Sequence, residues 1–308
     1  MKHLISIDDL SREKILQLFE LSRQLKRNPK KYYNALNGSN IGLIFEKPSM
    51  RTWVSFEAGI LSLGGGAIYL GPSDIALGIR EEVRDVARVL NRYLEGVVLR
   101  TYSHETIVEF EKYFKKPVIN GLSDQEHPCQ VLADIFTLTE KFPKKVNPTL
   151  AFIGDGNNVL NSHILAAAKL GGRLRYATPK RHEPPQHILN RAKQMAKKTG
   201  ALIEGFHDPR EAVKDADAVY TDVWVSMGQE KIRKQKIKAF QRMQVNQTLL
   251  KHAKKEAVIM HCLPAHRGEE ITDDVIESKR SVVFDQAENR LHIQKAILLD
   301  LIDEKGDL

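Results

Sequence analysis

The sequence predicts an α/β fold made of two doubly wound parallel-sheet domains of similar size, linked by helices. Short runs rich in β-branched residues alternate with amphipathic stretches along the chain. This rhythm is typical of βαβ units, in which helices cover both faces of a parallel sheet. The length of 308 residues also suits two domains of about 150 residues each better than one core.

The predicted strands are the short apolar runs at residues 41–45, 67–70, 96–100, 117–120, 149–154, 173–177, 201–206, 218–222, 257–261 and 281–284. Residues 82–94, 128–141, 158–170, 188–198 and about 291–302 have helical spacing of their apolar side chains. A Lys-, Pro- and Asn-rich segment at residues 141–148 marks the best boundary. The predicted domains are therefore residues 1–141 together with 291–308, and residues 142–290.

Composition limits the possible partners. Hydrophobic residues make up 42% and charged residues 28%, which is ordinary for a globular protein, and the net charge is 47 − 39 = +8. A mildly basic protein favours anionic substrates. The basic run at residues 231–238 is interpreted as a solvated helix face, so no nucleic-acid partner is predicted.

Cysteine content and hydropathy indicate the compartment. Two cysteines, Cys129 and Cys262, fit a reducing environment better than a disulfide framework. The first ten residues include acids where a signal peptide would be apolar. No apolar run approaches the ~18 residues of a membrane span. We therefore expect a cytoplasmic protein with no membrane partner.

An anion site is predicted where the first strand meets a helix. Ser49, Arg51 and Thr52 fall in the first turn of that helix. Free backbone N–H groups and the helix dipole attract an anion there, and a guanidinium grips phosphate oxygens with two prongs. The glycine-rich loop of NTP-hydrolysing proteins is missing, so a small phosphorylated metabolite fits better. An ordinary helix cap is the alternative interpretation.

Other polar side chains follow the ends of predicted strands, where open parallel sheets bind ligands. His127 and Gln130 are three residues apart and share a helix face. Arg100 and Cys262 also lie at predicted strand ends. Three of these residues have a structural alternative, which is a helix cap for His127, an ion-pair partner for Arg100 and inert packing for Cys262. The remaining candidates are Asp155 to Asn158, Asp222, Ser226 to Gly228, and His261 to Pro264. The spacing of histidines and cysteines matches no metal site, so no metal is predicted.

Five segments, in this order, resemble motifs of the aspartate/ornithine carbamoyltransferase family, and most closely those of its ornithine-using members. They are Ser49-Met50-Arg51-Thr52-Trp53, the His-Pro-x-Gln motif at 127–130, the Asp-x-Trp-x-Ser-Met-Gly loop at 222–228, His-Cys-Leu-Pro at 261–264 and Ala-Glu-Asn-Arg at 287–290. The resemblance covers essentially the whole chain. It implies one domain for carbamoyl phosphate and one for the amino acid. It also implies a homotrimer, or a multiple of trimers, with sites between subunits that the segment around Ser73 reaches.

The resemblance also implies a reaction and its residues. Carbamoyl phosphate and L-ornithine would give L-citrulline and phosphate, in arginine biosynthesis or, in reverse, arginine breakdown, with no cofactor. The implied catalytic residues are Arg100, His127 and Cys262. Carbamoyl phosphate would be bound by Ser49, Met50, Arg51, Thr52, Arg100, His127, Gln130, Cys262, Leu263 and Arg290. Ornithine would be bound by Asn158, Asp222, Ser226 and Met227. Gly228 and the charged run that follows it to residue 238 are predicted to form a mobile loop that closes over the amino acid, with an ordinary surface loop as the alternative.

Two positions depart from the family pattern. Met50 stands where the motif has Thr, and Trp53 stands where it has a second Arg. Both changes predict weaker contact with phosphate, so a non-catalytic binding protein is one alternative. Putrescine, aspartate or N-acetylornithine are alternative acceptors. Gly154-Asp155-Gly156 matches half of the glycine motif of dinucleotide-binding proteins. A dinucleotide-dependent oxidoreductase is therefore an alternative from a different functional class.

Overall fold

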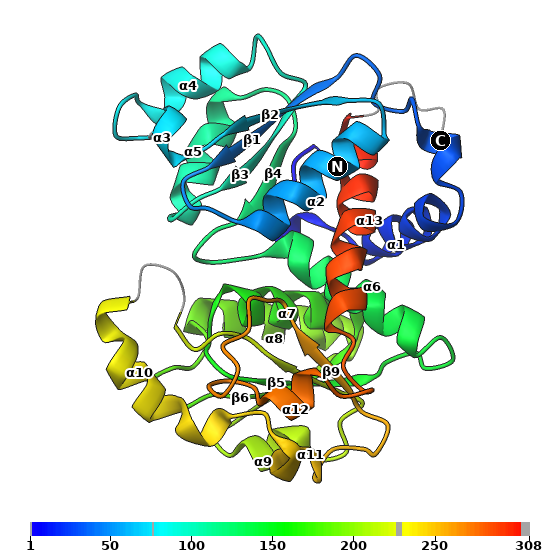
Figure 1. The fold of residues 1–308 in the computed structure, drawn as a ribbon, viewed down its shortest axis with the longest axis vertical. Coiled ribbons are helices and arrows are strands. Elements are labelled where there is room, and N and C mark those ends of the chain that lie inside the picture. Colours follow the sequence, from blue (N-terminus) through cyan, green and yellow to red (C-terminus); the bar gives the residue numbers. More distant parts are fainter. Residues whose placement is uncertain (1, 76, 226–229, 303–308) are drawn as a thin grey trace. The chain divides into compact units, whose positions relative to one another are not determined.

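The computed structural model describes residues 2–75, 77–225 and 230–302, and the chain divides into two compact units (Figure 1). Unit 1 runs to residue 133 and resumes at residue 288, and unit 2 comprises residues 134–287. Both divisions fall inside a helix, namely α6 (Pro128–Lys141) and α13 (Val283–Ile302). Among the described residues, each unit contains one parallel sheet, so the predicted fold class is confirmed.

Unit 1 has the strand order β2-β1-β3-β4, with every neighbouring pair parallel. The strands are β1 (Asn40–Phe45), β2 (Gly66–Leu70), β3 (Gly96–Arg100) and β4 (Val118–Leu122). The helices are α1 (Arg12–Arg27), α2 (Met50–Ser62), α3 (Pro72–Ile75), α4 (Val83–Leu90) and α5 (His104–Tyr113). Short 3-10 turns lie at Ile7–Asp9 and Pro29–Tyr32.

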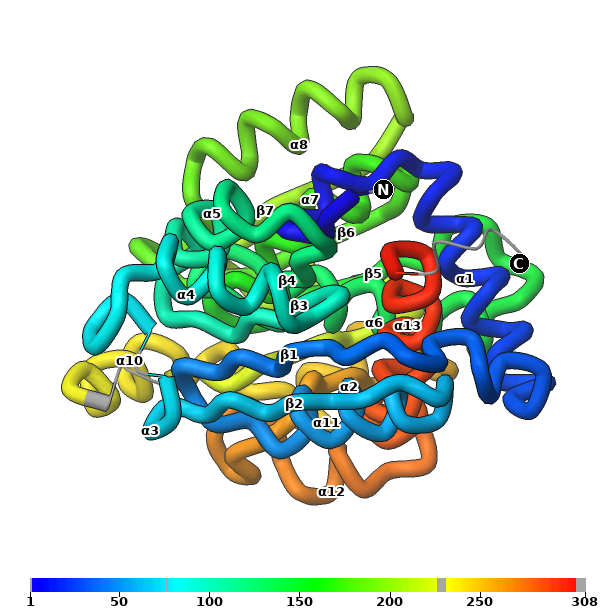
Figure 2. The backbone as a smooth tube through the Cα atoms, turned by 90° about the horizontal axis from the view of Figure 1, so that it is seen from above, coloured from blue at the N-terminus to red at the C-terminus, as the bar shows by residue number. Residues whose placement is uncertain are grey.

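The sheet of unit 1 is covered on both faces (Figure 2). On one face, Ile44 and Leu99 pack in a buried cluster with Val83 of α4 and Phe110 of α5. Helix α2 lies on the other face, beside α13 (Figure 1). A Cβ at Gly59 would lie 3.3 Å from Cγ of Lys295, so glycine lets these two helices approach closely. This packing fixes the start of α2 at the carboxyl end of β1.

Unit 2 has the parallel order β7-β6-β5-β8-β9. The strands are β5 (Thr149–Ile153), β6 (Arg173–Ala177), β7 (Leu202–Phe206), β8 (Ala218–Thr221) and β9 (Val258–His261). The helices are α7 (Asn158–Leu170), α8 (Gln186–Thr199), α9 (Pro209–Val213), α10 (Arg233–Phe240), α11 (Gln247–Leu250) and α12 (Asp273–Ile276). Further 3-10 turns lie at Glu230–Ile232 and Gln241–Met243.

In both sheets, the strand that comes first in the sequence lies between two other strands. Strand β1 lies between β2 and β3, and β5 lies between β6 and β8. The chain therefore extends first to one side of that strand and then to the other, and open sheets of this kind bind ligands at the carboxyl end of such a strand. The segments that follow β1 and β5 carry the predicted residues Ser49 to Thr52 and Asn158.

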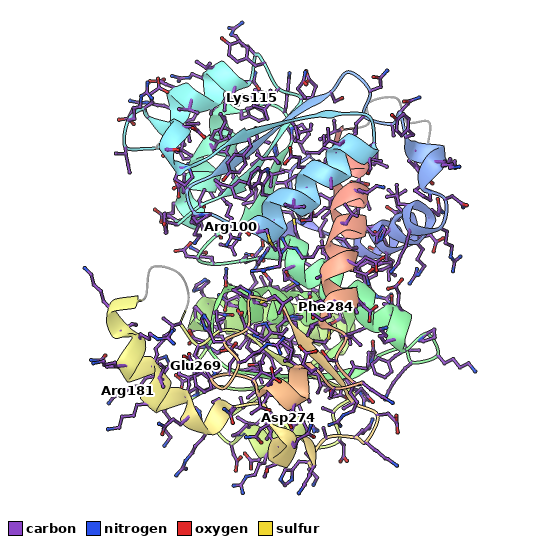
Figure 3. The ribbon with its side chains drawn as sticks, viewed as in Figure 1. Arg100, Lys115, Arg181, Glu269, Asp274 and Phe284 are labelled. Carbon is purple, nitrogen blue, oxygen red and sulfur yellow. The ribbon has the colours of Figure 1, made fainter. Side chains whose placement is uncertain are left out.

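The predicted strand at residues 281–284 is wrong. Ser281 forms only an isolated bridge with Ile259, where the N–H of Val282 donates to the carbonyl of Ile259 at 2.9 Å. Helix α13 begins at the next residue, and Phe284 is 68% exposed on its first turn (Figure 3). A short apolar run does not by itself distinguish a strand from the start of a helix, because both accept such residues.

The basic run at residues 231–238 is helical, but it is not wholly solvated. Lys236 of α10 is 5% exposed, and its ammonium pairs with the carboxylate of Asp155. Its Nζ also lies 5.8 Å from the centre of the Phe240 ring. One lysine of the run is therefore an internal counter-ion at the end of β5. Within the described part of the chain, the helices are too short or too polar to cross a membrane.

Candidate functional site

In unit 1 the predicted anion site falls on the turn between β1 and α2. Ser49 is the N-cap of α2, and its Oγ accepts from the N–H of Thr52 at 3.2 Å. The next strand is aligned with this turn: Arg100 lies beside Phe45 in the register, and its carbonyl accepts from the N–H of Glu46 at 2.8 Å. The strand ends therefore bring Arg100 to the first turn of α2 (Figure 3).

Thr52 is the centre of a buried cluster. Its Oγ1 accepts from Nη2 of Arg290 at 2.8 Å, and Nη1 of Arg100 lies 3.5 Å from the same oxygen. Thr52 is 0% exposed, Arg100 is 6% exposed and Arg290 is 4% exposed. Two guanidinium groups so near one another in a buried place favour an anion as their ligand.

His127 and Gln130 also lie at this cluster's end of unit 1. His127 precedes α6, and its carbonyl accepts from the N–H of Gln130 at 3.2 Å. Burial lowers the pKa of His127 well below its usual value, and the charges of Arg290, Arg100 and Lys47 lower it further. At neutral pH the ring is therefore uncharged, so it offers a single N–H donor.

Lys47 belongs to the same cluster, although the sequence argument did not name it. It is 6% exposed, and its Nζ lies 4.9 Å from the centre of the Tyr102 ring. Burial, and then the charge of Arg100, lower the pKa of Lys47 to about 8. The sequence feature that could have identified Lys47 is its position between a predicted buried strand and Ser49 at the start of the predicted helix.

Replacing Lys47 by glutamine is expected to weaken the binding of acetyl phosphate by about 10–100-fold at pH 7, because a charged hydrogen-bond donor is lost. The lowered pKa means that the wild-type lysine is charged below about pH 8 and loses its charge above it. Wild-type affinity should therefore fall between about pH 7 and pH 9, while the affinity of the variant stays flat.

Isothermal titration calorimetry measures this directly, because acetyl phosphate stays doubly ionised over that range. Lys115→Gln is the matched control, since Lys115 is an exposed lysine of unit 1 (Figure 3). Equal pH dependence in the wild type and in Lys47→Gln would show that Lys47 is not the titrating group.

The two residues that depart from the family pattern lie on the outer face of α2. Met50 is 67% exposed and Trp53 is 39% exposed. The ring of Trp53 stacks on Tyr69 of β2, with centroids 4.4 Å apart. Neither side chain replaces a group in the buried cluster around Thr52.

In unit 2 a second polar cluster surrounds Asp222, which directly follows β8 and is 7% exposed. Its Oδ2 accepts from Nδ2 of Asn157 at 2.7 Å, and its Oδ1 accepts from the thiol of Cys262 at 2.9 Å and the N–H of Val223 at 2.8 Å. These bonds hold a carboxylate at the carboxyl end of β8. A buried carboxylate in such a place is suited to a cationic group.

Cys262 is a hydrogen-bond donor here. Burial raises the pKa of its thiol well above the usual value, and the charge of Asp222 raises it further. The thiol is therefore protonated at neutral pH, which disfavours a covalent nucleophile. A protonated thiol fits a role in orienting a substrate group rather than in forming a covalent bond with it.

Asn157, the neighbour of the predicted Asn158, donates a hydrogen bond to Asp222. Asn157 is the N-cap of α7, and its Oδ1 accepts from the N–H groups of Val159 and Leu160. The Oδ1 of Asn158 also accepts from the N–H of Val159, at 3.0 Å. The role of Asn158 stays a prediction. Ser226, Met227 and Gly228 lie outside the described residues.

The glycine pair after β5 has a structural explanation. A Cβ at Gly156 would lie 2.5 Å from the backbone carbon of Glu183 and 2.5 Å from the nitrogen of Pro184. Gly156 is therefore required by the close approach of this loop. That requirement removes the main support for the dinucleotide interpretation.

Two groups of side chains among the described residues have the composition of a metal site: Asp222 with His261 and Cys262, and His266 with Glu269 and Glu270. In the first, both ring nitrogens of His261 already have protein partners. In the second, Nδ1 of His266 is 4.0 Å from each carboxylate, and Glu269 also pairs with Arg233. We assign a metal to neither group.

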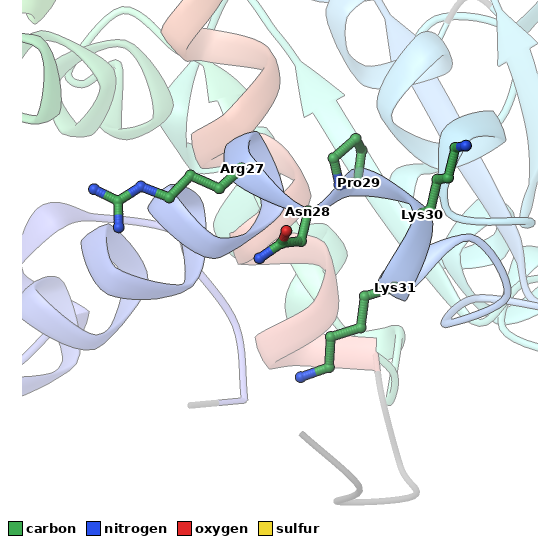
Figure 4. A pocket seen from close by; sticks show the side chains of 5 residues that line it. All are labelled: Arg27, Asn28, Pro29, Lys30 and Lys31. Carbon is green, nitrogen blue, oxygen red and sulfur yellow. The ribbon is translucent and has the colours of Figure 1, made fainter.

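A cavity of about 510 Å³ lies where α1 ends (Figure 4). It is lined by Arg27, Asn28, Pro29, Lys30 and Lys31. The predicted site residues are not among these five, so we assign the cavity no role in the site.

Family models match nearly the whole chain. The model for the aspartate/ornithine carbamoyltransferase carbamoyl-P binding domain matches residues 2–140, and the model for the Asp/Orn binding domain matches residues 147–301. An ornithine carbamoyltransferase of Archaeoglobus fulgidus is 50% identical over 310 residues, with 100% of each chain covered.

Solved structures agree with these matches. The ornithine carbamoyltransferase from Pyrococcus furiosus is 46% identical with a TM-score of 0.94, covering 99% of this chain and 97% of that one. The anabolic enzyme from Campylobacter jejuni is 41% identical, also with a TM-score of 0.94, covering 98% of this chain and 99% of that one.

Proposed function

The chain belongs to the aspartate/ornithine carbamoyltransferase family, and from this premise we propose that it transfers the carbamoyl group of carbamoyl phosphate to the side-chain amine of L-ornithine. The products are L-citrulline and phosphate. Relatives described as anabolic favour the direction of arginine biosynthesis. Residues 1–141 with 291–308 supply most of the carbamoyl-phosphate site, and residues 142–290 supply the ornithine site together with Leu263 and Arg290, which contact the carbamoyl phosphate.

The observation that carries the proposal is the convergence of Arg100 and Arg290 on Thr52 Oγ1. Three segments far apart in the sequence, each bearing a family motif or a strand end, supply one buried anion site. Thr52, Arg51 and Ser49 hold the phosphate through hydroxyls, guanidinium and backbone N–H groups, and Met50 contributes its N–H alone. Arg290 adds charge beside the leaving phosphate.

Negative charge develops on the carbamoyl oxygen as the amine attacks. Arg100, neutral His127 and Thr52 donate hydrogen bonds to that oxygen and stabilise the charge, which is usually the largest contribution to this kind of transfer. Gln130 and the carbonyl of Leu263 bind the carbamoyl NH2. The new C–N bond forms as the C–O bond to phosphate breaks, and phosphate leaves with its electron pair.

Ornithine carries ammonium groups, so its site uses a negatively charged side chain where the phosphate site uses positively charged ones. Asp222 binds the α-ammonium, Asn158 binds the α-carboxylate, and Ser226 with Met227 completes the contact. The attacking amine has a solution pKa near that of lysine, roughly 10.4, so it must lose a proton first. Cations close to the attacking amine would lower that pKa by like-charge repulsion. The thiol of Cys262 orients the amine.

The acceptor alternatives are weaker. Putrescine has no α-carboxylate, so it gives Asn158 no partner. Aspartate has no side-chain amine and brings a second carboxylate to Asp222. N-acetylornithine lacks the α-ammonium that Asp222 would bind. The similar proteins are ornithine carbamoyltransferases over their whole length, which removes the oxidoreductase alternative.

Carbamoyl transfer tests the function, measured as the ureido product formed when L-ornithine, putrescine or L-aspartate is supplied in parallel to the full chain with carbamoyl phosphate. We expect turnover with ornithine alone, and its loss in Arg51→Ala. Absence of turnover with all three amines in a folded protein would contradict the proposal. It would favour the binding-protein alternative and point to Met50 and Trp53.

A homotrimer in the cytoplasm is the proposed assembly, built through unit 1. An apolar stripe on α2, continued on edge strand β2, supports it, since exposed apolar patches mark interfaces. The stripe comprises Met50 at 67%, Trp53 at 39%, Val54 at 53%, Leu61 at 55% and Ile68 at 45% exposure.

Replacing Val54 and Leu61 together by glutamate is expected to convert the trimer to monomers, because two charges are placed on the apolar stripe. Light scattering after size-exclusion chromatography measures the mass. Glutamate at Val89 and Tyr93, which are also exposed in unit 1, is the matched control. A trimer that survives the change at Val54 and Leu61 would place the interface elsewhere.

A further inference from the structure

His261, the last residue of β9, is fixed by hydrogen bonds on every polar side within unit 2. Its N–H donates to Oε1 of Gln286 at 3.0 Å, and its Nδ1 accepts from the N–H of Leu263 at 2.8 Å. Its Nε2 lies 3.1 Å from Oε1 of Glu270. Because Nδ1 accepts, the neutral ring carries its proton on Nε2, where it donates to Glu270.

Leu263 has an uncommon backbone conformation that this ring supports. Its φ is +58°, in the left-handed region that side chains with a Cβ rarely adopt. The bond from its N–H to Nδ1 of His261 holds the peptide in that conformation. The direction of the Leu263 carbonyl, the group proposed to bind the carbamoyl NH2, therefore depends on how the imidazole is oriented.

Glu270 is itself held in place, so it can fix the orientation of the His261 ring. Its side chain is 0% exposed, and the same Oε1 accepts from the N–H of His266 at 2.5 Å. Its own carbonyl accepts from the N–H of Val245 at 2.8 Å, and Ile271 beside it is fully buried in the core. A buried carboxylate held from both its backbone and its side chain orients its partner strongly.

We propose that Glu270 is a positioning residue for the carbamoyl group. Acting through His261, it fixes the ring tautomer and the Leu263 peptide, so that the Leu263 carbonyl accepts a hydrogen bond from the carbamoyl NH2. The inference rests on the proposed function, since it needs carbamoyl phosphate as the substrate. It adds two residues, His261 and Glu270, that touch neither substrate nor reacting atoms.

Comparing carbamoyl phosphate with acetyl phosphate tests this role, because acetyl phosphate has a methyl group where carbamoyl phosphate has NH2. Glu270→Ala should lower kcat/KM for carbamoyl phosphate by about 10–100-fold, as displaced positioning groups do. The inhibition constant of acetyl phosphate should change by no more than about twofold. Glu277→Ala, an exposed glutamate of the same unit, is the matched control.

Two variants of His261 keep the test decisive if Glu270→Ala folds poorly. His261→Asn keeps an acceptor near the Nδ1 position, and His261→Gln keeps a donor near the Nε2 position. We expect the Asn variant to retain more of the carbamoyl-phosphate preference than the Gln variant. We also expect Glu270→Gln, which still has an Oε1 acceptor, to restore most of the activity that Glu270→Ala loses.

The outcomes separate the two proposals. A wild-type protein that makes no citrulline contradicts the proposed function. A wild-type protein that makes citrulline, with Glu270→Ala weakening carbamoyl phosphate and acetyl phosphate equally, overturns the inference and leaves the function intact. That result would mean that Glu270 supports only the stability of unit 2.

Discussion

Replacing Arg100 by glutamine is expected to lower kcat for citrulline formation by about 10³-fold, with a smaller change in KM for carbamoyl phosphate. Removing one donor from an oxyanion site typically costs about 10²–10³-fold, and here a full charge is lost with it. The side chain is 6% exposed, so water compensates poorly for the missing guanidinium. Steady-state kinetics with both substrates varied measures the two constants separately.

Two further variants sharpen the Arg100 result. Arg100→Lys keeps the charge but loses the planar two-pronged donor, so it should recover only part of kcat. Arg92→Gln changes an exposed arginine of unit 1 and should leave both constants unchanged. A rise in KM with an unchanged kcat in Arg100→Gln would assign Arg100 to ground-state binding and remove it from the catalytic step.

Replacing Asp222 by asparagine is expected to raise KM for ornithine by about 10²-fold or more, because the buried charge that we propose to pair with the substrate's ammonium is lost. The new amide also has one fewer acceptor for Nδ2 of Asn157 and the thiol of Cys262, which both donate to Asp222. Initial rates at varied ornithine and saturating carbamoyl phosphate give the measurement.

L-norvaline shows which ammonium Asp222 binds, since it has the α-amino and α-carboxylate groups but no side-chain amine. We expect its inhibition to weaken in parallel with ornithine binding in Asp222→Asn. Unchanged inhibition would mean that Asp222 contacts the side-chain amine. Asp208→Asn is the control, because Asp208 caps α9 and asparagine caps a helix equally well.

The same variant has a second readout at Cys262. The charge of Asp222 contributes to the raised pKa of the thiol, so removing the charge should lower that pKa. A larger thiolate fraction at a given pH then speeds alkylation by iodoacetamide. Cys129, whose pKa burial raises to about 12, should stay unreactive in both proteins.

The strand and helix pattern could be predicted from sequence because it depends on local periodicity. Strands β3 and β6 and helices α6 and α7 have the predicted limits. The prediction of a strand at residues 281–284 failed because tertiary contacts decide the structure of this segment. Ser281 forms a single bridge to Ile259, which is too little for a strand, and α13 begins at Val283.

The site residues that sequence reasoning missed are buried polar groups. Lys47 and Glu270 have ordinary neighbours in sequence, and each is notable only for what it touches after folding. Lys236 shows the same limit, since a lysine inside a basic run has no local sign of being buried. Motifs could locate the strand ends, but the partners behind them depend on tertiary contacts.

The gathering of buried cations around His127 has a consequence for the lifetime of the protein. The positive charges of Lys47, Arg100 and Arg290 repel one another in the folded protein. An anion that binds only the folded state relieves this repulsion. Occupancy at a hundred times the dissociation constant stabilises a fold by about 2.7 kcal/mol. In a cell, scarcity of the phosphorylated substrate would then leave more of the chain open to proteolysis. The abundance of the enzyme would follow the supply of the metabolite it consumes.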